Sequence, residues 1–183
     1  MSAPLTLFTI GHSNRSLAAL LEMLAAHGIK RLVDVRTIPR SRHNPQFNRE
    51  TLPDALAAAG IAYAHCPGLG GLRRPGADSP NRGWRNEGFR GFADYMATAE
   101  FAGELAALAA AAREQPTAIM CAEAVPWRCH RSLIADALVV GGNRVEHIMT
   151  AERRQAHKLT PFARIEAGRI TYPPEEPGLP GMG

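Results

Sequence analysis

The sequence contains only three cysteines and two lysines, and it has no long apolar run. Three cysteines are too few for a disulfide framework, so we expect free thiols in a reducing cytoplasm. No stretch approaches the roughly 20 apolar residues that span a bilayer. The N-terminus also lacks the basic segment followed by an apolar one that is typical of a secretory signal. These absences predict a cytoplasmic protein with no membrane partner.

The remaining composition is that of a folded protein. Of the 183 residues, 45% are hydrophobic and 21% charged, which argues against disorder and against a fibrous architecture. The length suits a single hydrophobic core, and we expect one α/β domain over residues 1–171. Residues 172–183 hold four prolines and three glycines. We expect them to form a loose tail, because this composition sustains neither a helix nor an interior strand.

Arginine makes up 19 of the 21 basic residues, and the net charge is +4. A GC-rich coding sequence would produce this bias. A site for phosphate or carboxylate would produce it too, because a guanidinium group offers two parallel hydrogen bonds to either anion. The positions of the arginines along the chain must decide between the two.

Short apolar runs alternate with helical runs from residue 5 to about residue 150, which is typical of βαβ repetition. Strands are expected at residues 5–10, 31–36, 62–66, 117–121 and 144–149, and helices at 16–27, 49–59, 92–114 and 129–140. Right-handed crossovers would place helices on both faces of a mostly parallel sheet of about five strands, a three-layer Rossmann-like sandwich. Residues 163–172 are a candidate for an additional edge strand.

Polar residues follow the expected strands, and ligands of open α/β sheets bind beyond the carboxyl ends of the strands. Four separate segments therefore converge on one edge of the sheet. The candidate catalytic residues in them are His12, Asp34, Cys121, Glu123, Cys129 and His130. The candidate anion-binding residues are Ser13, Arg36, Ser41, Arg42, Gly70, Gly71, Arg73 and Arg131.

The segment from residue 36 to residue 49 holds four arginines, one histidine and no acidic residue. It is either a solvated surface loop or a loop that binds an anion, and its position directly after a strand favours the second. Gly70 and Gly71 either let backbone amides approach a phosphate closely or form a plain tight turn. Asp34 interrupts an apolar strand, and its carboxylate needs a partner such as Arg36. This ion pair either only orders the loops or forms part of the ligand site.

Two cysteines frame the most specific local pattern, which runs from Cys121 through Glu123 to Cys129, His130 and Arg131. One thiol lies at a strand end and the other at a helix start, where backbone amides and nearby arginines would lower the pKa of Cys129. A thiol nucleophile with Glu123 and His130 as acid and base fits this pattern, and so does a redox-active pair. Free cysteine is also often a small buried hydrophobe.

A metal site is the remaining alternative at these residues, with His65 or Cys66 as further ligands. The spacing matches no familiar zinc pattern, so we assign no metal ligands. Trp84, Arg85 and Phe89 lie in a glycine-rich loop that is a candidate lid over the pocket.

Eight short motifs contain or flank the candidate residues: residues 9–14, 32–36, 39–42, 45–47, 69–71, 95–96, 120–123 and 129–131. Taken together, these motifs resemble the prokaryotic family known as domain of unknown function 488, over roughly residues 8–165. The resemblance implies that most of the candidate residues belong to motif positions of the family: His12, Asp34, Arg36, Ser41, Arg42, Gly70, Gly71, Cys121, Glu123, Cys129, His130 and Arg131. It implies no reaction and no cofactor.

Three functions are open. The first is an enzyme, a hydrolase or transferase, in which arginines hold a small phosphorylated or nucleotide-like substrate while Glu123, His130 and a cysteine do the chemistry. The second is a nucleic-acid-binding module in which Trp84 or Phe47 stacks on a base. Its phosphate track would consist of Arg36, Arg40, Arg42, Arg49, Arg73, Arg74, Arg82 and Arg85. The third is a metal-binding or redox-sensing protein. The density of titratable groups in the loops favours the enzyme.

Overall fold

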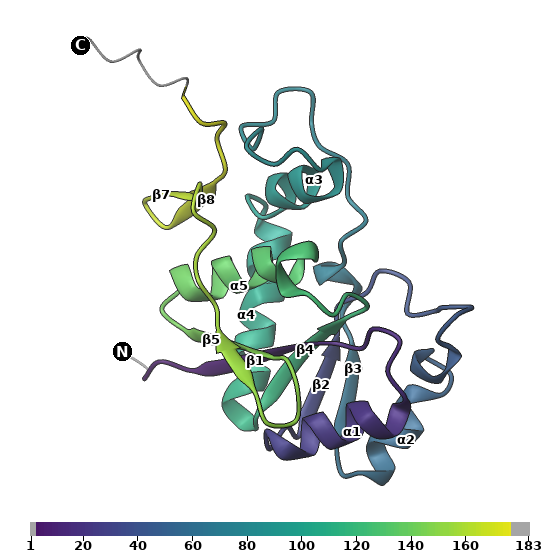
Figure 1. The fold of residues 1–183 in the computed structure, drawn as a ribbon. Coiled ribbons are helices and arrows are strands. Elements are labelled where there is room, and N and C mark those ends of the chain that lie inside the picture. The colour runs from purple at the N-terminus through teal and green to yellow at the C-terminus, as the bar shows by residue number, and fades with distance from the viewer. Residues whose placement is uncertain (1–2, 177–183) are drawn as a thin grey trace, which may run out of the picture.

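The computed structural model describes residues 3–176. Its centre is a six-stranded sheet with the strand order β3-β2-β4-β1-β5-β6 (Figure 1). The strands are β1 (Thr6–Gly11), β2 (Arg31–Asp34), β3 (Ala62–His65), β4 (Thr117–Cys121), β5 (Arg144–Ile148) and β6 (Arg154–Ala156). All neighbouring pairs are parallel except β5 and β6, which are antiparallel. The expected mostly parallel α/β sheet is confirmed.

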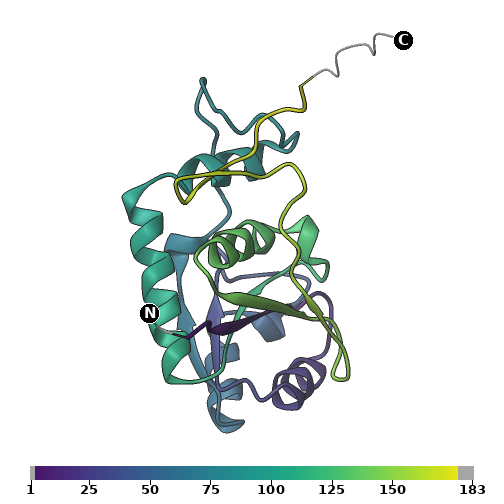
Figure 2. The ribbon, with the colours of Figure 1, turned by 90° about the vertical axis from the view of Figure 1, so that its left-hand side faces the viewer.

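Helices cover both faces of this sheet (Figures 1 and 2). They are α1 (Leu17–Ala26), α2 (Leu52–Ala58), α3 (Glu87–Tyr95), α4 (Ala99–Glu114) and α5 (Arg131–Val140). Leu20 of α1 and Leu56 of α2 belong to one buried cluster, whereas Phe92 of α3, Phe101 of α4 and Leu133 of α5 belong to the other. The three-layer sandwich is therefore confirmed.

The distribution of helices follows from the handedness of the crossovers. The chain moves from β1 to β2 and β3 in one direction across the sheet, then returns through β4 and continues to β5 in the other. Right-handed connections in opposite directions lie on opposite faces, so α1 and α2 cover one face and α3, α4 and α5 the other. The direction reverses between β1 and β4, which are neighbours. A ligand site is expected beyond the carboxyl ends of these two strands.

Local sequence explains how the elements begin and end. The Ser16 hydroxyl accepts a hydrogen bond from the Ala19 amide at 3.1 Å and caps α1. Gly28 ends α1 with φ +68°, a left-handed conformation that glycine adopts without steric cost. The central strand β4 is buried at all five positions, which explains why its sequence is a continuous apolar run rather than an alternating one.

Two expectations about the elements were wrong. The single helix expected over residues 92–114 is two helices, because Thr98 caps α4 by accepting the Phe101 amide at 3.2 Å and breaks the run. The edge strand expected at residues 163–172 is instead a separate hairpin of β7 (Arg164–Glu166) and β8 (Arg169–Thr171). Its two-residue turn, Ala167–Gly168, has positive φ at both positions, as the tightest hairpin turns require. The sixth strand of the sheet is β6.

The chain after β6 runs along α5 toward α3 (Figures 1 and 2). Tyr172, the first residue of the expected tail, is fully buried and donates a hydrogen bond to Asp136. Residues 177–183 of that tail lie outside the described residues. Among the helices of residues 3–176, none has the length and apolar character needed to cross a bilayer.

Candidate functional site

A pocket of about 910 Å³ opens beyond the carboxyl ends of β1 and β4, where the chain direction reverses. This volume lies within the usual range for small-molecule sites, about 300–1,000 Å³. Nine of the fourteen candidate residues from the sequence line it: His12, Ser13, Arg36, Ser41, Gly71, Cys121, Glu123, Cys129 and His130. The topology therefore brings together loops that are more than a hundred residues apart in the chain.

Glycines allow the loops to approach one another closely at this edge. A Cβ atom on Gly11, the last residue of β1, would collide with the carbonyl oxygen of Glu123 in the loop after β4. A Cβ atom on Gly71 would lie 2.7 Å from Nδ1 of His130. Gly71 thus brings the loop after β3 against the imidazole ring, and a larger residue there would displace one of the two.

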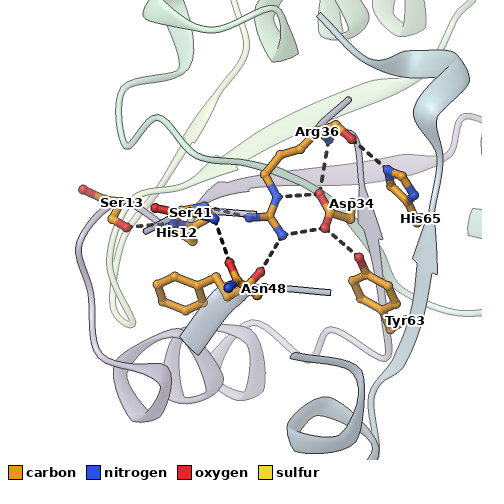
Figure 3. Close-up of polar contacts among 9 residues, drawn as sticks. His12, Ser13, Asp34, Arg36, Ser41, Asn48, Tyr63 and His65 are labelled. Carbon is orange, nitrogen blue, oxygen red and sulfur yellow. Dashed lines mark hydrogen bonds and ion pairs between the residues drawn. The ribbon is translucent and has the colours of Figure 1, made fainter. Parts of the chain in front are cut away.

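Arg36 is fixed at the base of the pocket by a buried ion pair with Asp34 (Figure 3). Its Nε donates to Oδ1 of Asp34 at 2.8 Å and its Nη2 to Oδ2 at 2.7 Å, while the Tyr63 hydroxyl donates to the same Oδ2 at 2.7 Å. Nη2 also donates to the Phe47 carbonyl, and Nη1 lies 3.3 Å from Nε2 of His12. These contacts use four of the five guanidinium protons. Among the described residues, none accepts the fifth, on Nη1.

His12 supports Arg36 as a neutral imidazole. Its Nδ1 donates to the Ser13 carbonyl at 2.7 Å, which leaves Nε2 as an acceptor toward Arg36. Burial lowers the pKa of His12, and the ring stacks on Phe47 at a centroid distance of 4.5 Å. Ser13 has φ +50°, an uncommon backbone conformation for a residue other than glycine. Such strain is often found at functional sites.

The cysteines at the two ends of the loop after β4 meet in the pocket wall. The sulfurs of Cys121 and Cys129 are in contact, and the Cα atoms lie 7.5 Å apart. Disulfides usually join Cα atoms separated by about 4.4–6.8 Å, so a relaxed covalent bridge would draw the two backbones together. The expectation of free thiols is therefore wrong for Cys121 and Cys129, which are paired. It holds for Cys66, whose pKa is raised to about 12 by burial and by its hydrogen bond to Glu104.

Cys129 lies directly beside a possible base. Its sulfur is 3.5 Å from Nδ1 of His130 and accepts the Arg131 amide, the first of α5, at 3.5 Å. The Nε2 of His130 faces the Val35 carbonyl at 3.0 Å and therefore carries the proton, which leaves a lone pair on Nδ1. Burial lowers the pKa of His130 to about 4, so the imidazole is neutral at pH 7. A helix N-terminus and a neutral base are both features that favour thiolate formation.

Glu123 and Arg131 have different positions in the same loop. The Glu123 side chain is exposed in the pocket wall. Arg131 is fully buried and donates from Nη2 to the Glu123 carbonyl at 2.6 Å and from Nη1 to the Thr9 hydroxyl at 3.0 Å. Burial lowers the pKa of Arg131 to about 10. Arg131 therefore holds the loop in place from below.

Five candidate residues do not line the pocket: Asp34, Arg42, Gly70, Arg73 and Arg131. Asp34 is buried behind Arg36, and Arg42 is exposed outside the pocket wall. Arg73 stacks on the Tyr95 ring at 3.4 Å and donates to two carbonyls of its own loop. Gly70 packs against Thr37.

Several pocket residues were missed in the sequence. Arg128 adds positive charge and lies in the loop between Cys121 and Cys129, so its position in a segment already singled out was an available signal. Arg40 also adds positive charge, and the sequence had suggested it only for the phosphate track of a nucleic-acid-binding module. Ile38 and Leu72 are apolar, exposed and at the pocket, for which no sequence signal existed. Of the candidate lid, Phe89 lies in α3 and not in a loop, and it lines the pocket. Trp84 and Arg85 do not line it.

The two aromatic residues expected to stack on nucleic-acid bases pack within the protein. Phe47 is fully buried against His12. Trp84 contacts Phe89, Phe162 and Tyr172, and its indole N–H is buried. Within residues 3–176, no group of three histidine, cysteine or acidic side chains is arranged to hold a metal ion.

Comparison with known proteins gives one match. No curated protein and no solved structure matches the chain. One family model, described as domain of unknown function DUF488, matches residues 16–138, a narrower range than the motifs had indicated. The matched range contains both cysteines of the pocket, His130 and the Asp34–Arg36 pair. Because it covers about two thirds of the sequence, the chain belongs to the DUF488 family.

Proposed function

We propose that the chain is an enzyme that acts on a small phosphorylated or nucleotide-like molecule, with Cys129 as nucleophile and His130 as general base. The observation that carries this proposal is the placement of a neutral imidazole lone pair 3.5 Å from a sulfur that also accepts a helix N-terminal amide. Both groups line a pocket of small-molecule size. A buried structural cysteine would not need either feature.

Anion recognition is assigned to Arg36 at the base of the pocket and to Arg40 and Arg128 on its walls. Arg36 is preorganised, because its ion pair with Asp34 fixes the guanidinium plane and leaves one Nη1 proton for a ligand. Arg40 and Arg128 are exposed side chains that are able to close onto the ligand. Ile38, Leu72 and Phe89 supply apolar surface for an uncharged part such as a base or sugar.

The chemical step transfers a group from the substrate to sulfur. The Cys129 thiol gives its proton to Nδ1 of His130 while Nε2 keeps its proton toward Val35. The sulfur then forms a bond to the electrophilic atom of the substrate, and the leaving group departs with the electron pair of the broken bond. His130 returns the proton from Nδ1 to that group, and Glu123, which lines the pocket, accepts a proton from the second nucleophile. Water in a hydrolase, or a second substrate in a transferase, then displaces the sulfur.

Thermal unfolding with added ligands tests recognition. Inorganic phosphate, ribose 5-phosphate and AMP are expected to raise the melting temperature of the reduced protein, since a ligand of the native state stabilises it by mass action. The effect should weaken in Arg40→Leu and Arg128→Leu. Arg42→Leu is the matched control, because Arg42 is exposed in the same loop as Arg40 but outside the pocket wall. No shift with any of these ligands would count against the substrate class.

A second candidate function is thiol redox chemistry, favoured by the contact between the sulfurs of Cys121 and Cys129. In this role both thiols would lose a hydrogen to a disulfide substrate and become a bridge. The Cys121→Ser variant separates the two functions. A nucleophilic enzyme still turns over a phosphorylated substrate in this variant, because only Cys129 forms the covalent intermediate, whereas a dithiol reductant stops at a mixed disulfide between Cys129 and its substrate.

A further inference from the structure

The two cysteines of the pocket form a pair within reach of small oxidants. Cys121 is the last residue of β4, and Cys129 directly precedes the first turn of α5, eight residues further along the chain. Their sulfurs are in contact, and both residues line the pocket. Cys121 is 2% exposed and Cys129 is 5% exposed. A molecule as small as hydrogen peroxide that enters the pocket therefore finds both sulfurs at the same place.

Cys129 has the surroundings of the more reactive partner. Its sulfur lies 3.5 Å from the unprotonated Nδ1 of His130 and accepts the Arg131 amide at 3.5 Å. Both neighbours favour the thiolate, which is the form of cysteine that peroxides oxidise. Within residues 3–176, the hydrogen-bond acceptor that faces Cys121 is the Glu123 carbonyl at 3.8 Å, a contact that only a protonated thiol makes. Oxidation is therefore expected to begin at Cys129.

The third cysteine, Cys66, provides the contrast. It lies outside the pocket wall, and its thiol donates to Glu104 at 3.2 Å. Burial and this hydrogen bond raise the pKa of Cys66 to about 12, so its thiolate is scarce at neutral pH and its oxidation should be slow. Cys66 is thus an internal control for an oxidation that is confined to the pocket.

We propose that Cys129 is a site of oxidation by hydrogen peroxide, and that Cys121 converts the product into a reversible bridge that switches the active site off. The inference rests on the proposed function, because the bridge consumes the nucleophile assigned there. It differs from the reductant role, because the oxidant is a peroxide and the bridge controls the reaction of the pocket rather than carrying it out.

The oxidation has two steps. The Cys129 sulfur attacks one oxygen of the peroxide, the O–O bond breaks, and the leaving hydroxide takes the proton held by His130, which yields a sulfenic acid and water. The Cys121 sulfur then attacks the Cys129 sulfur, the S–O bond breaks, and a second water leaves with the Cys121 proton. The two thiols together lose two hydrogen atoms, and one peroxide is reduced to two waters. A thiol reductant reverses the change.

The contact between the sulfurs decides the fate of the sulfenic acid. More peroxide would carry it to a sulfinic acid, which thiol reductants do not reverse. Cys121 needs no approach through solvent to reach the Cys129 sulfur, so bridge formation is expected to be faster than this second oxidation. The bridge therefore protects Cys129 while it blocks it.

Thiol counting tests the proposal without a substrate. The reduced protein is treated with hydrogen peroxide, denatured, alkylated with iodoacetamide and analysed by mass spectrometry. We expect three alkylated thiols before treatment and one after it, at Cys66, with all three restored by dithiothreitol. Cys66→Ser is the matched control and should lose both of its remaining thiols under the same conditions. The proposal is overturned if all three thiols survive the treatment, or if the bridge includes Cys66 or joins two molecules.

The Cys121→Ser variant separates the two steps. Without the second sulfur, excess peroxide should convert Cys129 to a sulfinic acid, a gain of two oxygen atoms that dithiothreitol does not reverse. Cys121→Ala, which keeps the apolar character of this buried position, should give the same result. If dithiothreitol fully restored Cys129 in both variants, the protective role of Cys121 would be refuted.

The outcomes also separate this proposal from the proposed function. If Cys129 is activated for alkylation but no bridge forms, the switch fails and the enzyme proposal stands. If the bridge forms but Cys129 is alkylated with the pH dependence of an ordinary thiol, the enzyme proposal fails and the oxidation site remains.

Discussion

Replacement of Asp34 by asparagine tests the ion pair beneath the pocket. Asp34 is fully buried and accepts two hydrogen bonds from the Arg36 side chain, one from the Arg36 amide and one from Tyr63. Asparagine keeps the shape but presents a single acceptor oxygen and no charge, so a guanidinium that is 8% exposed loses its counter-ion. Removal of one partner from a buried pair typically costs about 3–5 kcal/mol. We expect Asp34→Asn to lower the free energy of unfolding by about this amount.

Urea denaturation measures this change by linear extrapolation. The control is Glu50→Gln, which breaks the ion pair between Arg40 and Glu50. That pair spans 3.8 Å, with side chains 73% and 67% exposed, so the expected loss is below about 1 kcal/mol. If Asp34→Asn proved as mild as Glu50→Gln, Arg36 would not be held by the carboxylate, and its preorganisation for an anion would be refuted.

Three further predictions concern histidine, glycine and tyrosine residues. Burial lowers the pKa of His130 to about 4 and of His147 to about 3, from 6.5, so the unfolded chain binds more protons below pH 6.5. The contribution of these two histidines to the free energy of unfolding should therefore be constant above that pH and fall below it, by up to about 1.4 kcal/mol per pH unit for each histidine. Denaturation at a series of pH values below 8 would show this. Gly71→Ala should destabilise the protein by about 1–3 kcal/mol in thermal unfolding and slow the alkylation of Cys129. The control Gly103→Ala, where a Cβ atom meets nothing within 4 Å, should be neutral or stabilising. Equal effects of the two substitutions would contradict the close approach of Gly71 to His130. Tyr172→Phe removes a donor to buried Asp136 and should cost about 1.5–3 kcal/mol in urea denaturation, a loss that would be absent if residues from 172 onward were loose.

Periodicity and topology rules made most of the fold predictable. The apolar run of β4 and the helical spacing of α1 and α5 depend on neighbours in the chain, and the parallel sheet follows from their alternation. The break between α3 and α4 was missed because the apolar spacing continues across it, and a threonine cap was the only local signal. The β7–β8 hairpin was missed because its turn, Ala167–Gly168, is only two residues long. So short a turn hardly interrupts the run, which therefore resembles a single strand.

The location of the pocket was predictable from the sequence, and the burial and contacts of the residues around it were less so. Strand ends led to His12 and Cys121, because every parallel strand delivers its last residues to the same edge, and the helix start after β4 led to Cys129. Arg131 was expected to bind an anion but is buried in the first turn of α5, and the side on which an arginine at a helix start lies depends on packing. A chain of hydrogen bonds from Arg131 to Asp136, which runs through Thr9, His147 and His157, was invisible because its members come from four distant segments.

The pH dependence of Cys129 alkylation tests the central claim most directly. The measurement uses reduced protein that carries Cys66→Ser and Cys121→Ser, which leaves Cys129 as the sole thiol of the chain. An activated thiol should react with iodoacetamide along a curve whose midpoint lies at least one unit below the ordinary value of about 8.5, and His130→Asn should move that midpoint upward. A midpoint at or above the ordinary value, unchanged by His130→Asn, would contradict the claim that Cys129 is a nucleophile.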